Sequence, residues 1–157
     1  MRATSIPALT AILLLAGCAS AARGGQPAAS PDPGGVTTET CVSWVEFETP
    51  SDAAEDAEAV VRGTIGDPAG TAPVFGVDAP VWTVDVAEWI EGEGPDRIEV
   101  ISTPVTCEGT PSPDPFASAE GEMILFLHLD ESRWRGITPL QALVAPGPDG
   151  QVPARWK

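Results

Sequence analysis

Side chains able to carry out catalysis are scarce in this chain. Its only histidine, His128, lies in an apolar stretch between Leu127 and Leu129. A Ser-His-Asp set cannot be argued from one histidine without a context such as G-x-S-x-G, and zinc sites normally need several His or Cys ligands. We therefore interpret His128 as a structural or surface-facing strand residue, and we predict a protein that is not an enzyme and has no cofactor.

Acidic residues offer a second chemistry, the binding of a cation. Asp114, Glu120 and Glu122 could bind calcium, but no D-x-D-x-D-G loop surrounds them. Solvated loop carboxylates are the simpler interpretation, and no metal site is predicted. The Gly-rich segment 66–70 does not match either phosphate-binding pattern. A hydrolase or metal-dependent enzyme with an acidic site is kept as an alternative function.

A partner-binding site is a third option, centred on Trp134. This tryptophan lies between Arg133 and Arg135, in the densest basic spot of an acidic chain. Tryptophan and arginine are the residue types most enriched at binding hot spots. The three residues are therefore candidates for contact with a partner. The alternative is that Trp134 covers one end of the domain while the arginines pair with nearby acids.

The charge balance limits which partners are expected. The chain holds 8 Lys and Arg against 23 Asp and Glu, which gives a net charge of −15. Nucleic acids and anionic lipid surfaces are bound through Lys and Arg, so we predict no nucleic-acid partner. The acidic surface would attract cations or a basic partner, or it would only keep an exported domain soluble.

The N-terminus predicts export. Arg2 precedes an apolar run over residues 6–15 and the small residues Ala16 and Gly17, which is the layout of a secretory signal peptide. The run is shorter than the roughly 20 residues that a bilayer span needs.

The last four residues of this segment, Leu15-Ala16-Gly17-Cys18, resemble the lipobox of bacterial lipoproteins. The resemblance implies that residues 1–17 are a signal peptide and that Cys18 is diacylglycerated and becomes the mature N-terminus. The protein would then be lipid-anchored at the extracytoplasmic face of the cell membrane, since about two acyl chains give stable attachment. The alternative is an ordinary signal peptide cut near residues 19–22, with Cys18 discarded.

Two cysteines, Cys41 and Cys107, are left if Cys18 carries lipid. Disulfides persist in oxidising compartments, and we predict a bridge between these two residues. It would close a loop of about 67 residues, which the chain-entropy model values at roughly 4 kcal/mol. A reactive thiol or a metal-binding pair is the competing interpretation, but neither cysteine has a histidine or a basic cluster close to it in the sequence.

The composition divides the chain after its signal peptide into a tether and one domain. Segment 18–38 is rich in Gly, Pro, Ala and Ser and has too few large apolar residues to fold. We predict that it is a flexible tether with a reach of roughly 25 Å. Residues 39–157 are predicted to form a single domain.

Most of this domain reads as short strands with Gly and Pro between them. In the clearest strand, residues 81–90, Trp82, Val84 and Val86 face one side. A short helix over 53–57, capped by Ser51 or Asp52, and a loop over 66–80 are also expected. The predicted strands cover residues 41–47, 59–66, 81–90, 97–103, 122–130, 134–140 and 151–152.

This pattern predicts an all-β fold, a small OB-like closed barrel of five to seven strands with at most one short helix. The order of the pieces over residues 41–152 also resembles the OB-fold domains of the netrin/TIMP-like kind. The tissue-inhibitor members chelate a protease zinc through a free N-terminal cysteine, whereas Cys41 follows a tether. The resemblance therefore implies the fold and no binding residues. It is carried by segment 59–65, by Trp82, Val84, Val86, Trp89, Ile90 and Gly92, by Gly121-Glu122 before segment 124–127, and by an early and a later cysteine.

Together these features predict a lipid-anchored, exported binding or interaction module at the cell envelope. Its ligand would be an envelope protein, a glycan or a small molecule. Besides the enzyme alternative, a passive surface or spacer lipoprotein without a specific ligand is the third hypothesis, because a fold of this class does not fix a function.

Overall fold

The computed structural model describes residues 41–106 and 113–156. The predicted signal peptide, the predicted tether, Cys18 and Cys107 lie outside the described residues. The described part of the chain contains the helix α1 (Pro50–Asp56), the 3-10 turn η1 (Phe116–Ser118) and the strands β1 (Ala59–Val74), β2 (Val77–Glu91), β3 (Arg97–Ile101), β4 (Glu122–Asp130), β5 (Arg133–Gly136) and β6 (Leu143–Val144).

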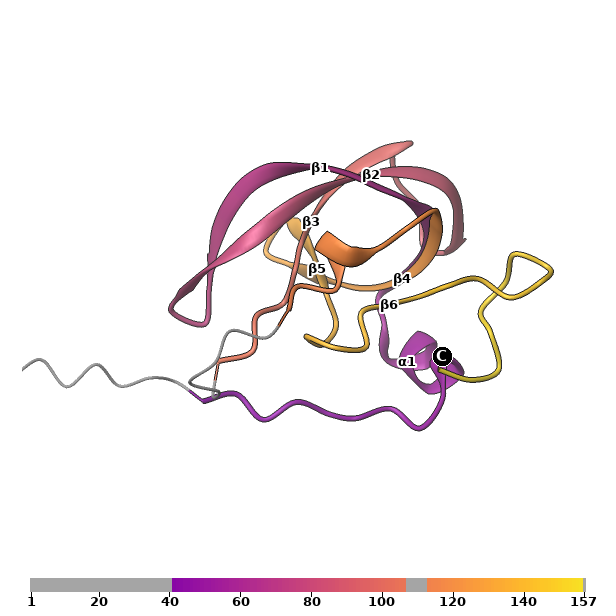
Figure 1. The fold of residues 1–157 in the computed structure, drawn as a ribbon, viewed down its shortest axis with the longest axis horizontal. Coiled ribbons are helices and arrows are strands. Elements are labelled where there is room, and N and C mark those ends of the chain that lie inside the picture. The colour runs from indigo at the N-terminus through magenta and orange to yellow at the C-terminus, as the bar shows by residue number, and fades with distance from the viewer. Residues whose placement is uncertain (1–40, 107–112, 157) are drawn as a thin grey trace, which may run out of the picture. The chain divides into compact units, whose positions relative to one another are not determined.

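Five of these strands close into a ring. β1 pairs antiparallel with β2, β2 with β3 and β4 with β5, while β3 runs parallel to β5. The ring closes because β1 also pairs with β4, from Ala59↔Leu127 to Thr64↔Glu122. The short strand β6 pairs with β4 outside this cycle. The arrangement, drawn in Figure 1, confirms the predicted all-β fold with one short helix.

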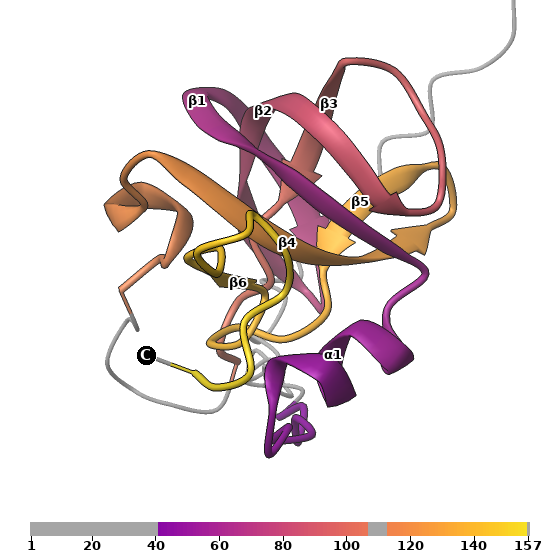
Figure 2. The ribbon, with the colours of Figure 1, turned by 90° about the vertical axis from the view of Figure 1, so that its right-hand side faces the viewer.

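β4 is buried on both of its faces, as its apolar run predicts. Side chains alternate across a strand, so within residues 123–127 of β4 the odd-numbered residues join one hydrophobic cluster and the even-numbered residues join another. The second cluster lies outside the ring, where Figure 2 shows α1. The first cluster includes Met123, Leu125 and Leu127 of β4 with Val84 and Val100, and the second includes Ile124 and Phe126 with Ala53 of α1.

The loop predicted over residues 66–80 is wrong, because β1 and β2 continue through it as one long hairpin. The strand register shifts on both sides of Pro68, and such bulges are where a strand accommodates Pro and Gly. The hairpin turns at Phe75 and Gly76, both with positive φ, 51° and 84°. This is the backbone signature of a two-residue type I′ turn.

The strand predicted over residues 41–47 is also wrong. This segment lacks regular secondary structure, and the edges of β4 are taken by β1, β5 and β6. It is fastened by side chains instead. The backbone of Phe47 donates to Oε1 of Gln141 at 2.9 Å and accepts from Nε2 of Gln141 at 2.9 Å. Nε1 of Trp156 also donates to the Phe47 carbonyl, at 3.0 Å.

The helix begins earlier than predicted and is capped by Thr49 instead of Ser51 or Asp52. Pro50 occupies the first helical position, which suits its fixed φ and its missing N–H. Asp52 is then the third helical residue, and it forms a capping box with Thr49.

The C-terminal strands differ from the prediction in two places. β5 ends at Gly136 instead of residue 140. A Cβ at Gly136 would lie 2.6 Å from the Cβ of Ala142, so the chain folds back closely on itself here. The last strand is β6, Leu143–Val144, and the predicted strand over 151–152 is absent from the described residues. A turn replaces it, in which Gly147 donates to the Gln151 carbonyl at 2.9 Å.

Candidate functional site

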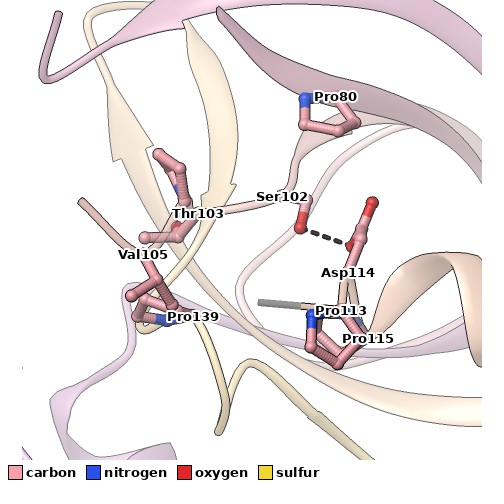
Figure 3. A pocket seen from close by; sticks show the side chains of 9 residues that line it. Pro80, Ser102, Thr103, Val105, Pro113, Asp114, Pro115 and Pro139 are labelled. Carbon is pink, nitrogen blue, oxygen red and sulfur yellow. Dashed lines mark hydrogen bonds between the residues drawn. The ribbon is translucent and has the colours of Figure 1, made fainter. Parts of the chain in front are cut away.

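A pocket of ≈ 190 Å³ lies where β3 ends. The residues that follow β3 form one wall, and the residues that lead into η1 form another (Figure 3). Two residues from elsewhere in the chain, one in β2 and one after β5, complete it. The lining consists of Pro80, Ser102, Thr103, Pro104, Val105, Pro113, Asp114, Pro115 and Pro139.

Local sequence explains why the chain leaves the sheet at this point. The N–H of Ser102 still donates to the carbonyl of Pro80, at 2.9 Å. Pro104 has no N–H and cannot extend a ladder. On the opposite wall, Phe116 is buried in the first hydrophobic cluster, and this anchors η1. Burial of Phe116 therefore limits the position of Asp114, which lies two residues before it.

Asp114 joins three parts of the fold. Its Oδ2 accepts a hydrogen bond from Nε1 of Trp82 in β2 at 2.8 Å. Its Oδ1 accepts from Oγ of Ser102 at 2.7 Å and from the N–H of Phe116 at 2.9 Å. Hydrogen bonds to an ionised carboxylate are among the stronger ones in proteins. This carboxylate therefore ties β2, the end of β3 and η1 together at the pocket.

Thr103 forms the other polar part of the wall. Its hydroxyl donates to the carbonyl of Gly136 and accepts from Nη1 of Arg135 at 3.2 Å. The same Nη1 also donates to the Gly136 carbonyl, at 3.1 Å. Nε of Arg135 lies 3.6 Å from Oδ2 of Asp130. The guanidinium of Arg135 thus contacts Thr103 and also lies close to the carboxylate of Asp130.

The residues predicted for partner contact, Arg133, Trp134 and Arg135, do not share one face of β5. Trp134 packs on the first hydrophobic cluster and its ring lies 5.7 Å from that of Trp89. Arg133 is exposed. Arg135 is largely covered and stands over the ring of Phe75, 5.4 Å from its centroid. Contact of these three residues with a partner stays a prediction.

His128 lies between two carboxylates. Its Nε2 is 3.5 Å from Oδ2 of Asp56, and its Nδ1 is 3.5 Å from Oε2 of Glu58. Because the two carboxylates meet different nitrogens of the ring, they do not converge on one point. In the part of the chain that the structure describes, no three His, Cys, Asp or Glu side chains are grouped to hold a metal ion.

The acids considered for calcium are separated in the fold. Glu122 and Glu88 accept hydrogen bonds from Arg62 at 2.9 and 3.0 Å, and these bonds, that of Glu88 first, raise the pKa of Arg62. Asp114 belongs to the pocket, and Glu120 is exposed. Elsewhere on the surface, a 2.6 Å hydrogen bond from Arg97 lowers the pKa of Asp85.

Two hydrogen-bonded residues flank the predicted disulfide in sequence. The N–H of Val42 donates to Oγ1 of Thr106 at 3.0 Å. Val42 follows Cys41 and Thr106 precedes Cys107, so this bond brings the neighbours of both cysteines together. Cys107 lies outside the described residues, and the bridge stays a prediction that this contact supports.

Comparison of the chain with protein-family models, curated proteins and solved structures finds no match. Among the described helices, none has the length and apolar character needed to cross a membrane.

Sequence reasoning missed the pocket, although one signal for it was present. Prolines are dense on both sides of Asp114, and a proline also follows the Ser102-Thr103 pair. Prolines at this density disfavour a strand and indicate that the chain leaves the sheet here. No local pattern in the sequence indicates that Asp114 bonds to Trp82 in β2, because the two residues are 32 positions apart.

The role of Asp114 predicts the effect of Asp114→Asn. An amide offers one acceptor oxygen and one donor group in place of two acceptor oxygens, so the donor of Trp82 or Ser102 loses its partner. We expect a loss of about 1–3 kcal/mol in the free energy of unfolding, measured by urea denaturation with Trp fluorescence. Asp78→Asn, at an exposed position of the hairpin, should leave stability unchanged. Equal stability of the two variants would contradict the proposed role of Asp114.

The Val42–Thr106 contact leads to a prediction for the cysteines. Digestion of the non-reduced protein should release one peptide pair that joins Cys41 to Cys107, detected by mass spectrometry and lost on reduction. The Cys18→Ala variant is the control, since it removes the third cysteine and should leave that pair intact. Recovery of two alkylated thiols from the untreated protein would refute the bridge.

Proposed function

We propose that this chain is an exported, lipid-anchored module that binds a ligand at the cell envelope. The observation that carries the binding role is the pocket at the end of β3, with Ser102 and Asp114 in its wall. Ligand sites combine apolar walls with a few well-placed polar groups. The prolines here supply the apolar wall, and the three hydrogen bonds to Asp114 hold the polar group in place before a ligand arrives.

The size of the pocket favours a small ligand or one group of a larger one. Sites for drug-sized molecules have volumes of roughly 300–1,000 Å³, and this pocket has ≈ 190 Å³. The acidic-enzyme alternative would need a carboxylate that can exchange a proton with a substrate. The carboxylate of Asp114 instead accepts three hydrogen bonds from donors of the protein, which favours a binding role.

The proposed anchor rests on the segment Leu15-Ala16-Gly17-Cys18. A diacylated Cys18 would give stable membrane attachment without a spanning helix. The following segment 19–38, with its Gly, Pro, Ala and Ser, would separate the domain from the lipid.

Loss of the anchor residue should release the protein. In cells that express the Cys18→Ala variant, we expect the protein to move from the membrane pellet to the soluble fraction after ultracentrifugation. Ser20→Ala, a substitution two residues away, is the matched control and should stay with the membranes. Retention of Cys18→Ala in the pellet at the level of the control would overturn the anchor.

The binding role is tested by screening small fragments against the full chain in detergent, with ¹⁵N-labelled Trp as the probe. Ligands of the pocket should shift the indole signal of Trp82, which bonds to Asp114, in a saturable way. Val105→Phe fills the pocket and should abolish the shift, while Val45→Phe, at a position 64% exposed, should not. A screen without any saturable shift would favour a passive spacer.

A further inference from the structure

We infer that the pocket at the end of β3 recognises a primary alkylammonium group on a short aliphatic stem. This inference rests on the proposed binding function and names the chemistry of its ligand. The side-chain hydrogen-bond donors of the pocket already bond within the protein, whereas acceptor positions remain. The one ionisable side chain among the described lining residues is the acid Asp114.

The side-chain hydrogen-bond donors of the described lining residues are used within the protein. Five of the nine described lining residues are prolines, which have no backbone N–H. The hydroxyl of Ser102 donates to Asp114, and its N–H donates to Pro80. The hydroxyl of Thr103 donates to Gly136. An anionic or carbonyl ligand would therefore find few donors to bind.

Acceptors remain on the same wall. An ionised carboxylate has about four acceptor positions on its two oxygens, and Asp114 uses three of them. The lone pairs of the Ser102 Oγ are a further acceptor, since this hydroxyl is the donor in its bond to Asp114. A group that only donates, such as –NH₃⁺ with three donors, complements this wall.

The charges around the pocket favour the same ligand. Asp114 is the one ionisable side chain among the nine described lining residues. Arg135 does not line the pocket; it contacts the lining residue Thr103 and has Asp130 beside it. Figure 3 shows Thr103 and Asp114 on opposite sides of the pocket. The Asp114 side is therefore the negative end, while the chain as a whole carries −15.

An organic cation fits this wall better than a metal ion. Calcium takes 6–8 oxygen ligands, commonly several of them carboxylates, and this wall has one carboxylate. Proline rings instead present apolar surface on the remaining sides. A stem of about four carbons would bury its methylenes against these rings, with the ammonium at Asp114.

The test titrates n-butylammonium, 1-butanol and butyrate into the full chain at pH 7 and follows the Trp82 indole signal. We expect a saturable shift with n-butylammonium and binding at least about tenfold weaker for the neutral and anionic analogues, since a charge-assisted hydrogen bond is lost. Nα-acetyl-lysine methylamide distinguishes the sources. Tighter binding than n-butylammonium assigns the site to a lysine side chain of a partner, and weaker binding assigns it to a free amine.

Two variants keep this test decisive. Asp114→Asn should remove the preference for the ammonium, and its fold is checked by its unfolding midpoint. Where it does not fold, Val105→Phe takes its place, because it blocks the pocket without changing Asp114, and it should abolish the shift. Equal affinity for n-butylammonium and 1-butanol would overturn the ammonium inference and leave the binding function in place. No saturable shift with any of the probes or fragments would overturn both.

Discussion

The pairing of β1 with β4 is the interaction on which the rest of the structure depends. It joins residues 59–64 to residues 122–127 and turns a row of strands into a ring. Without it, both strands would expose an unpaired edge, which promotes association with other chains. Within the same stretch of β1, a Cβ at Gly63 would lie 2.6 Å from the carbonyl oxygen of Asp85 in β2. The close pairing of β1 with β2 at this point therefore favours a residue without a side chain.

Closure has a consequence at the end of β3. A filled ring leaves no room in its interior for a ligand, because β4 places Leu125 and Leu127 there and η1 adds Phe116. The described pocket lies instead where the chain leaves the ring, at the end of β3. At the end of β3 the chain leaves the sheet but stays packed against the domain. Asp114 accepts hydrogen bonds from Ser102 and Trp82 and so connects this segment to β2. The same carboxylate that stabilises this end of the ring shapes the pocket.

The sequence predicts the elements whose pattern is local. The bounds of β4 agree with the apolar run 122–130, and the inward face of β2 follows from its alternation, with Val84 fully buried. The predictions are wrong where the secondary structure of a segment depends on which other strand it pairs with. Pro68 and Gly70 indicate a loop by type, yet they lie at bulges of a hairpin that the sheet supports. Segment 41–47 has the composition of a strand but pairs with none of the described strands. The Trp82–Asp114 contact at the pocket joins residues 32 positions apart, so no local pattern in the sequence indicates it.

The path of residues 42–47 bears on the size of the proposed ligand. Val42 is bonded to Thr106, which follows the pocket residue Val105 directly. The chain thus enters the domain beside the pocket, and Phe47, held by Gln141 and Trp156, fixes its continued path toward α1. A macromolecule that covered the pocket broadly would meet this segment. A single short side chain or a small amine would not, because it needs only the opening between Asp114 and Thr103. The entry point of the chain and the volume of the pocket therefore favour the same conclusion, a ligand group of a few atoms.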